Sequence, residues 1–243
     1  MHSASSGKVG VMRNRNMIAL TLALVLLFAA STAAQEVVFT SVVKSKYLGP
    51  DGAIWYDRPL LQSDIAVTLK NGIFFDVWGS TSDNKKSGWD KEIDLTFGYS
   101  KSIKKFEYSI EGSYYFVQGI DIFTGSIDVS IDFPVSPFIH FSGYWPAKRG
   151  GPKEGALLIG GLRARLDFGK GSGLALEASG RNDNGAFGYD PAWIAMGRAD
   201  LDIALSKKFK ILLGVEYARP LTVVGDGRKE EIVWKAGFSI RLK

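Results

Sequence analysis

The sequence predicts an all-β protein, a twelve-stranded antiparallel up-and-down β-barrel that spans a membrane and follows an N-terminal signal peptide. Three observations predict it: apolar and polar residues alternate with a period of two, successive connections differ regularly in length, and aromatic residues lie near both strand ends. The composition agrees, because 46% hydrophobic residues with 28 glycines in 243 residues is typical of neither a disordered chain nor a multi-pass helical protein.

The first segment has the composition of an export signal. Three basic residues and no acidic residue precede an apolar run over residues 17–30, which leads to small residues ending at Ala34. This order is typical of a cleaved secretory signal peptide, whereas a membrane anchor, the alternative, needs about 20 apolar residues. We therefore expect residues 1–34 to be a signal peptide and residues 35–243 to form one barrel domain.

The composition also excludes several kinds of site. The chain has no cysteine, which excludes a disulfide framework, a cysteine zinc site and a thiol nucleophile. His2 and His140 are the only histidines, so a multi-histidine metal site is excluded as well. The predicted signal peptide holds three of the 30 basic residues and none of the 25 acidic ones, so the mature chain is nearly neutral. We expect no cofactor, no metal and no nucleic-acid partner.

Alternation of apolar and polar residues continues through almost the whole mature chain. In residues 92–99, for example, Ile93, Leu95 and Phe97 alternate with acidic or small polar residues. This pattern is typical of a strand with one apolar face. The twelve predicted strands cover residues 37–43, 61–69, 73–79, 92–99, 106–116, 126–133, 138–144, 156–168, 174–180, 193–205, 209–217 and 232–242.

The connections between these strands alternate in length. Those after even-numbered strands are short and rich in Gly, Pro, Asn or Ser, at residues 70–72, 102–105, 134–137, 169–173 and 206–208. Those after odd-numbered strands are longer, except around residues 117–120. A meander then has short turns at one end and long loops at the other, as outer-membrane barrels have.

The apolar face carries aromatic residues near both strand ends. Phe106 begins a strand that Phe116 finishes, and Trp193, Trp234 and Tyr144 fall at the long-loop end. Two aromatic belts about one membrane thickness apart are expected where amphipathic rings lie at headgroup level. We therefore expect the apolar face to contact lipid and the polar face to line the lumen.

The polar face predicts a hydrated lumen. Thirteen acidic and five basic residues fall on it, an excess that requires water, bound cations or protonated carboxyl groups. Twelve strands give a width between a filled eight-stranded barrel and an open sixteen-stranded channel. The residues that we expect to line the pore are Asp64, Glu92, Asp94, Glu111, Asp128, Arg163, Arg165, Arg198, Asp200 and Glu216.

The last predicted strand resembles the C-terminal signal that the outer-membrane assembly machinery reads. The pattern has a polar residue at Lys235, glycine at Gly237 and apolar residues at Ile240 and Leu242. Many such proteins end on an aromatic residue, whereas this chain ends on Lys243. The resemblance implies that these four positions form a membrane-assembly signal.

Several short motifs lie in the first third of the mature chain. They are Ser45-Lys46-Tyr47, Asp51-Gly52, Pro59, Gln62, Asn71-Gly72, Val77-Trp78-Gly79-Ser80, Glu92-Ile93-Asp94 and Gly98-Tyr99. With these motifs the chain resembles the TorF-like porin family of Gram-negative bacteria. An Arg-Gly pair often follows the tyrosine in that family, and Leu48-Gly49 stands there instead. The resemblance implies a porin-like barrel in the outer membrane.

One arrangement suggests catalysis. His140 and Ser142 are two apart on a predicted strand, so their side chains point the same way, here with Phe138 and Tyr144 toward lipid. They resemble the His-x-Ser of the outer-membrane phospholipase, whose orienting asparagine lies on the neighbouring strand. The neighbouring segment 156–168 contains no asparagine. We therefore expect no enzymatic activity.

The short turns are basic. They and their edges carry Lys70, Lys101, Lys104, Lys105, Lys170, Lys207, Lys208 and Lys210. Two interpretations stay open: docking onto phospholipid phosphates, or solvated turn residues that also discourage edge pairing.

Together these features predict a narrow outer-membrane channel for passive diffusion of small hydrophilic solutes or ions, with a preference for cations. Its expected partners are outer-membrane lipids, lipopolysaccharide and the assembly machinery. The alternatives are a non-conducting structural or adhesive barrel whose outer loops bind a ligand, and a soluble periplasmic barrel with an apolar interior. Ion pairing of Arg163, Arg165 and Arg198 with the inward acids would favour the non-conducting barrel.

Overall fold

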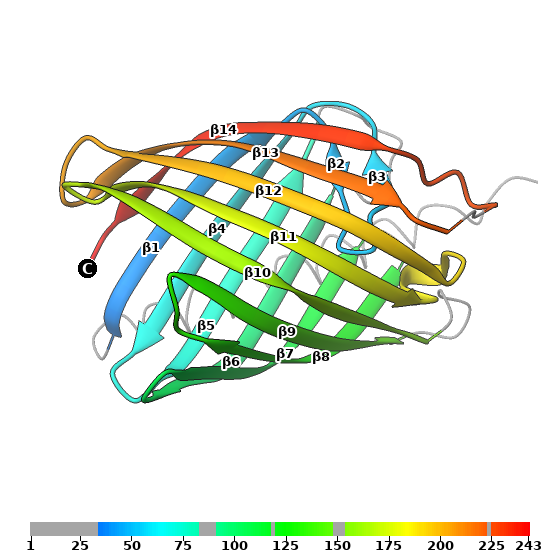
Figure 1. Cartoon of the computed structure of the whole chain (residues 1–243), viewed down its shortest axis with the longest axis horizontal. Helices are drawn as coiled ribbons and strands as arrows, with labels where there is room; N and C mark the ends of the chain where they lie inside the picture. The colour runs from blue at the N-terminus through cyan, green and yellow to red at the C-terminus, as the bar shows by residue number, and fades with distance from the viewer. Residues whose placement is uncertain (1–33, 83–90, 118–119, 148–153, 223–224) are drawn as a thin grey trace, which may run out of the picture.

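The computed structural model describes residues 34–82, 91–117, 120–147, 154–222 and 225–243, and it is a closed antiparallel barrel (Figure 1). The strands follow one another around the barrel in chain order, and pairing of the first with the last and with β4 completes the circle. The barrel strands are β1 (Ala34–Lys44), β4 (Leu60–Leu69), β5 (Ile73–Thr81), β6 (Glu92–Ile103), β7 (Phe106–Val117), β8 (Ile120–Ile131), β9 (Val135–Pro146), β10 (Gly155–Gly169), β11 (Ser172–Asn184), β12 (Ala192–Ala204), β13 (Phe209–Pro220) and β14 (Glu231–Arg241).

The predicted number of barrel strands and the alternation of short turns with longer connections are confirmed. The main shift in boundaries is at β8, which begins six residues before the predicted 126. β9 begins three residues before the predicted 138, so that Pro137 lies inside the strand. There β9 pairs with β10 but no longer with β8, whose last partner is Phe138. The predicted signal peptide lies outside the described residues, apart from Ala34. No helix in the described part of the chain is long and apolar enough to cross a membrane.

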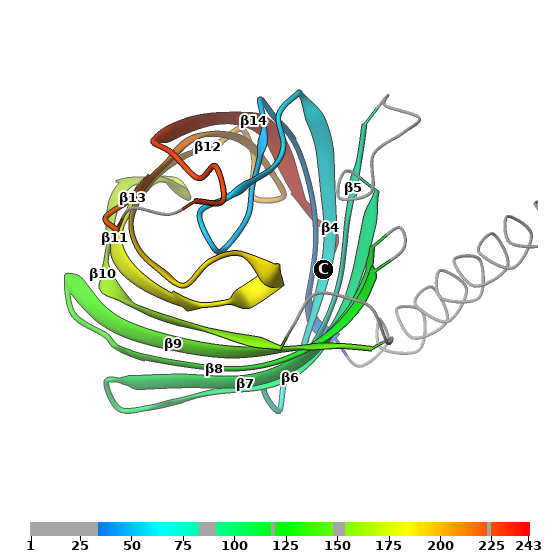
Figure 2. The ribbon, with the colours of Figure 1, turned by 90° about the vertical axis from the view of Figure 1, so that its right-hand side faces the viewer.

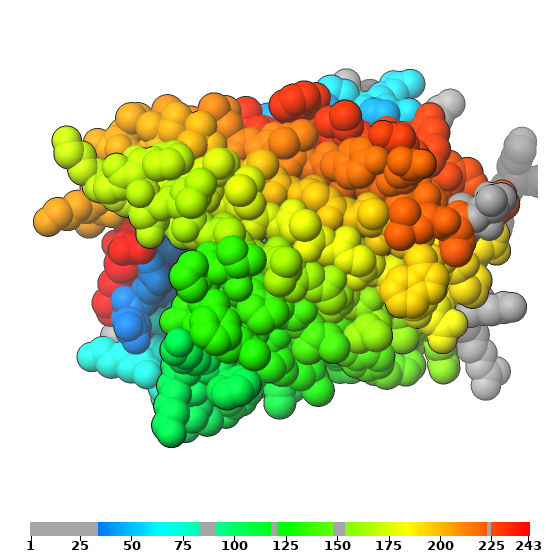
Figure 3. Space-filling model, viewed as in Figure 1, coloured from blue at the N-terminus to red at the C-terminus, as the bar shows by residue number. Residues whose placement is uncertain are grey.

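The outer surface of the barrel is apolar. Large apolar side chains that point away from the lumen are strongly exposed, for example Phe106 at 56%, Trp193 at 51% and Trp234 at 64%. Figure 3 shows the outer face of the strands from β9 to β13. A surface of this kind is stable in contact with lipid rather than water. The exposed aromatic residues include members of both predicted belts. Tyr144, which was predicted to lie in one of these belts, is buried instead.

The connection between β1 and β4 folds into the barrel instead of extending away from it. It contains β2 (Tyr47–Leu48) and β3 (Ile54–Tyr56), which pair antiparallel as a small hairpin. Figure 2, seen from the long-loop end, shows this hairpin within the ring of strands, with the 3₁₀ helix η1 (Ala186–Gly188) beside it. Both segments lie in connections that were predicted to be long loops. The segment from 47 to 56 is called the inserted hairpin below.

Candidate functional site: the barrel lumen

One part of the inner face is uniformly acidic. The inward positions of β4–β7 carry six carboxylates and no lysine or arginine. This group, called the acidic wall, is Asp64, Asp76, Glu92, Asp94, Glu107 and Glu111. Asp64 is within hydrogen-bonding reach of Asp76, and Glu92 is within reach of Asp94. Among the described residues, no basic side chain forms an ion pair with any of the six.

A cavity of about 320 Å³ adjoins the acidic wall. Its lining includes the carboxylates of Asp76, Asp94 and Glu111 together with the hydroxyls of Thr96 and Ser113. Carboxylates that face a polar cavity without a basic partner attract water and cations. This cavity therefore suits a hydrated cation better than an anion.

The other part of the inner face mixes both signs of charge. The inward positions of β1 and β10–β14 form what is called the paired wall. Its charged residues are Glu36, Lys44, Arg163, Arg165, Asp167, Glu177, Arg181, Asp183, Arg198, Asp200, Asp202, Lys210, Glu216, Glu231, Lys235 and Arg241.

Each charge on the paired wall has a partner of opposite sign. Arg163 Nε lies 3.1 Å from Glu177, Arg165 Nη2 lies 3.3 Å from Asp202, and Lys44 Nζ lies 2.9 Å from Glu216. Arg198 pairs with Asp200, and Lys235 also lies 2.8 Å from Asp200. A second cavity, of about 490 Å³, adjoins this wall. Because the charges are paired, this side of the lumen is locally close to neutral.

The ten predicted pore-lining residues all lie on the inner face. Asp64, Glu92, Asp94 and Glu111 belong to the acidic wall, and Arg163, Arg165, Arg198, Asp200 and Glu216 to the paired wall. Asp128 on β8 lies between them, 3.6 Å from both Arg163 Nη1 and His140 Nδ1. Their role as a pore lining stays a prediction.

The count of five inward bases was too low. Lys44 and Arg181 also face the lumen, and both lie just beyond the ends of the predicted strands 37–43 and 174–180. Lys210, interpreted as a turn lysine, faces inward and lies 3.6 Å from Asp202. Alternation carried one residue further along each strand would have identified Lys44 and Arg181, and Lys210 already lies at an inward position of the predicted strand 209–217.

The inserted hairpin packs through aromatic rings against one side of the lumen. The ring of Trp55 lies 5.1 Å from that of Tyr47 and 4.5 Å from that of Phe187 in η1. The ring of Phe187 lies 4.3 Å from that of Tyr144 on β9. These side chains form a buried cluster with Leu157 on β10. The outer half of the lumen therefore has an apolar core of its own.

The opposite flank of the inserted hairpin packs against the paired wall. Leu48 lies in a second buried cluster with Ile194 on β12, Ala218 on β13 and Val233 on β14. At the hairpin turn, Gly52 has φ of +75°, and an added Cβ would lie 2.9 Å from Ile194. Both the backbone conformation and the space require glycine here. The hairpin thus contacts both sides of the barrel.

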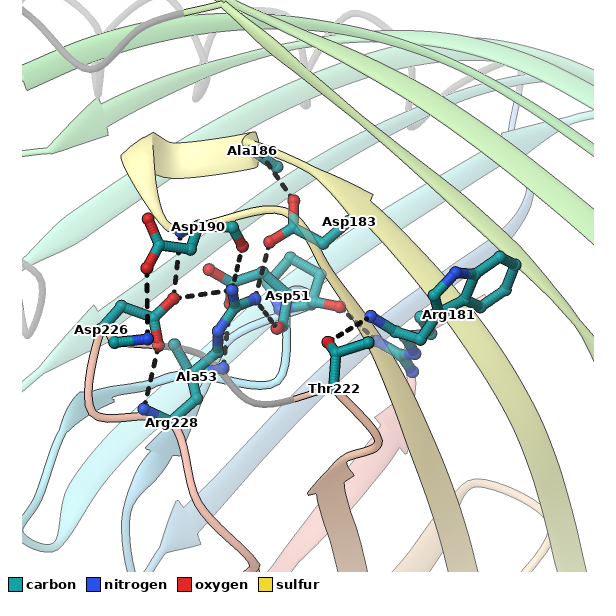
Figure 4. Close-up of polar contacts among 12 residues, drawn as sticks. Asp51, Ala53, Arg181, Asp183, Ala186, Asp190, Thr222, Asp226 and Arg228 are labelled. Atoms are coloured by element: carbon teal, nitrogen blue, oxygen red, sulfur yellow. Dashed lines mark hydrogen bonds and ion pairs between the residues drawn. The ribbon is translucent and has the colours of Figure 1, made fainter.

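Polar contacts lock the inserted hairpin in place (Figure 4). Arg228, from the connection between β13 and β14, donates to Asp183 Oδ2 at 2.7 Å and to the carbonyl oxygen of Asp51 at 3.1 Å. It also pairs with Asp226 at 2.7 Å, and it hydrogen-bonds the carbonyl of Asp190. The Arg228 and Asp183 side chains are 1% and 0% exposed. Such a buried pair is held tightly, because loss of either partner leaves an isolated charge.

The hairpin has two further polar anchors and one internal one. Tyr47 Oη donates to Glu92 Oε2 on the acidic wall at 2.7 Å, and Arg181 Nη1 donates to the carbonyl oxygen of Pro50 at 2.7 Å. Within the turn, Asp51 Oδ1 accepts from Trp55 Nε1 at 3.1 Å. Burial raises the pKa of Asp51 to about 7.

The prediction that Phe138, His140, Ser142 and Tyr144 point toward lipid is wrong. Phe138, Ser142 and Tyr144 are buried inside, whereas Phe141 on the alternate face is 48% exposed. Both faces of β9 are apolar, because the inserted hairpin supplies an apolar surface inside the barrel. An apolar face therefore does not identify the lipid side at this end of the barrel.

The structure brings Asp128, His140 and Ser142 into the order of a catalytic triad. His140 Nε2 lies 3.3 Å from Ser142 Oγ, and Asp128 lies on the other side of the imidazole ring. However, Ser142 is 1% exposed and also hydrogen-bonds the hydroxyl of Tyr144 at 3.0 Å. A substrate carbonyl has no access to the Ser142 hydroxyl oxygen. The arrangement is therefore a chain of buried polar contacts. Among the described residues, no group of three His, Asp or Glu side chains could hold a metal ion.

No protein-family model and no curated protein matches this chain. Solved structures do. The NanC porin matches with a TM-score of 0.59 and 11% identity, over 85% of this chain and 100% of that one. The KdgM porin matches with a TM-score of 0.57 and 10% identity, over 84% of this chain and 98% of that one. A KdgM porin in complex with disordered oligogalacturonate matches with a TM-score of 0.56 and 10% identity, over 84% and 98%. The chain therefore shares its barrel fold with these porins.

Proposed function

We propose that this protein is a narrow outer-membrane channel for passive diffusion of small hydrophilic solutes or ions, with a preference for cations. The acidic wall carries the proposal, because six carboxylates that have no basic partner in the described part of the chain face the interior of a closed barrel. Fixed charge of one sign along a confined aqueous path raises the local concentration of counter-ions. The paired wall adds little to this field, since its charges are neutralised nearby.

The membrane location rests on the outer surface. Phe97, Ile110 and Leu162 are each more than half exposed, and they lie on different strands of a barrel without open edges. Water would make such a surface aggregate, whereas lipid would stabilise it. The porins that share the fold support the same location. The predicted signal peptide would supply the export step, and Lys235, Gly237, Ile240 and Leu242 on and after β14 would be read by the assembly machinery.

The proposed solute follows from the sign of the free charges. The related KdgM structure contains oligogalacturonate, whose carboxylates an acidic wall would repel. A monovalent cation or a small neutral solute is the better candidate for this chain. The inserted hairpin, which contacts both walls, would narrow the path at its outer end.

The test is planar-bilayer recording of the refolded barrel with a KCl gradient across the membrane. We expect small, steady current steps and a reversal potential whose sign indicates cation selectivity. A reversal potential on the anion side would overturn the cation preference while leaving a channel. The barrel is shown to be folded by its resistance to unfolding in sodium dodecyl sulfate. If such a folded barrel gives no current, the protein is not a channel.

The second candidate function is a closed barrel that binds a ligand with its outer loops. Two observations favour it: Arg163, Arg165 and Arg198 all pair with acids, and Arg228 locks the inserted hairpin. A cavity of about 230 Å³ also lies at the long-loop end of the barrel, and its lining includes Tyr189. Replacing residues 47–56 by a Gly-Ser linker separates the two functions. A silent wild type with a conducting linker variant would favour the closed barrel.

A further inference from the structure

The short-turn end of the barrel carries a belt of exposed lysines. Seven of them lie on or beside the turns of four different hairpins, and among the described residues none has an acidic partner. This lysine belt is Lys70, Lys101, Lys104, Lys105, Lys170, Lys207 and Lys208. Lys210, the eighth lysine of this region, pairs instead with Asp202 inside the barrel. Because the four hairpins lie around the barrel, the belt follows its rim.

An apolar ring lies directly beside the lysine belt. Ile103, Phe106, Phe168 and Leu205 are 50%, 56%, 59% and 62% exposed, and each is within three residues of a belt lysine. Lys105 Nζ lies 4.5 Å from the centre of the Phe133 ring, which is itself part of this ring. Side chains of this exposure belong in hydrocarbon, so the belt lies where hydrocarbon gives way to headgroups.

The backbone gives an independent indication. Lys104 has φ of +56° and Lys170 has φ of +53°, a conformation that glycine or asparagine adopts far more readily. At both turns a lysine occupies the strained position. No contact within the described chain accounts for either side chain, which points to a partner outside the chain.

We propose that the lysine belt binds the phosphate groups of anionic phospholipids in the leaflet at the short-turn end. The proposal rests on the membrane location argued above. A lysine ammonium is a compact charge that suits phosphate, and each one near an anionic surface strengthens attachment by up to about fivefold. A soluble polyanion fits less well, because the lysines follow the rim beside the apolar ring instead of converging over the mouth of the lumen.

The experiment measures retained lipid by native mass spectrometry of the folded barrel. The barrel is equilibrated in micelles that contain equal amounts of phosphatidylglycerol and phosphatidylcholine. For the wild type we expect phosphatidylglycerol to be retained about tenfold over phosphatidylcholine. A variant with Lys104→Gln, Lys105→Gln, Lys170→Gln, Lys207→Gln and Lys208→Gln should show a much smaller preference, because only two belt lysines remain. The same five lysines changed to arginine should leave the preference as in the wild type. Lys229→Gln, at the long-loop end, is the position control.

Two results would overturn the proposal: equal retention of both lipids by the wild type, or an unchanged preference in the Gln variant. A second variant guards against misfolding. Lys104→Gly with Lys170→Gly relieves the strained backbone, so it should fold at least as stably while its preference falls. Failure of the wild type to insert into vesicles of either lipid would contradict the membrane location itself.

Discussion

The two walls of the lumen differ in how their charges are satisfied. On the paired wall, Lys235 contacts both Asp200 and Glu216, and each strand carries both acidic and basic inward residues. On the acidic wall, Glu92 and Asp94 contact each other, and Glu92 accepts a hydrogen bond from the hydroxyl of Tyr47, with no basic partner for either in the part of the chain that the structure describes. Paired charges hold neighbouring strands and the hairpin in place, whereas unpaired carboxylates can act on what passes through the lumen. We therefore propose that the paired wall has a structural role and that the acidic wall sets selectivity.

The largest effect is expected where pairing is most buried. Arg228→Met leaves the Asp183 carboxylate buried without its partner, which should destabilise the inserted hairpin by about 3–5 kcal/mol. We expect a larger single-channel conductance, because the released hairpin no longer narrows the lumen. Lys229→Met, whose side chain is 73% exposed, is the matched control. Unchanged conductance and unchanged thermal unfolding of the Arg228 variant would contradict the role of the lock.

A smaller effect is expected where the hairpin contacts the acidic wall. Tyr47→Phe removes the hydrogen bond to the buried Glu92 carboxylate, which should cost about 1–3 kcal/mol in unfolding free energy. Tyr56→Phe is a matched control on the same hairpin, because the buried Tyr56 hydroxyl has no hydrogen-bond partner among the described residues. Equal losses in the two variants would show that ring packing alone holds the hairpin there.

The hairpin should also respond to pH through Asp51. Burial raises its pKa to about 7 from 3.8, so the inserted hairpin binds a proton more tightly than a released, solvated one. The stabilisation is complete below about pH 4 and is lost as pH rises to about 7. Conductance should therefore increase from pH 5 to pH 8. Asp51→Asn should abolish this dependence, whereas Asp57→Asn, on the exposed part of the same connection, should preserve it.

The smallest effect is expected at an exposed pair on the paired wall. Arg165 pairs with Asp167 at 3.0 Å, but these side chains are 41% and 74% exposed. Arg165→Gln should change the unfolding free energy by less than about 1 kcal/mol, because water screens the pair. Urea unfolding in detergent measures it. A loss as large as that of Arg228→Met would mean that burial does not separate structural from incidental pairs on this wall.

Period-two alternation was enough to predict the barrel, because an apolar outer face and a polar inner face require opposite polarity in successive residues. It failed where the inner face is itself apolar. The inserted hairpin is short and lies inside the barrel, so Tyr47 and Trp55 show no strand signal of their own. Its apolar surface also reverses the interpretation of β9, where Phe138 and Tyr144 face inward.

Part of the lumen was equally predictable. Strand parity alone predicts that Asp64, Glu92, Asp94 and Glu111, four residues of the acidic wall, face inward. The pairing of Arg228 with Asp183 does not, because 45 residues separate them and the arginine comes from a loop. Contacts between loops inside a barrel depend on how the loops fold, which alternation does not describe.

The central claim is that the acidic wall sets selectivity and the paired wall does not. It is tested most directly by reversal potentials of two variants in one KCl gradient. Asp76→Asn with Asp94→Asn and Glu111→Gln removes unpaired carboxylates, whereas Arg163→Gln with Glu177→Gln removes a pair without changing the net charge. We predict that the first variant loses the cation preference and the second keeps the wild-type value. An unchanged reversal potential in the first variant would contradict the account.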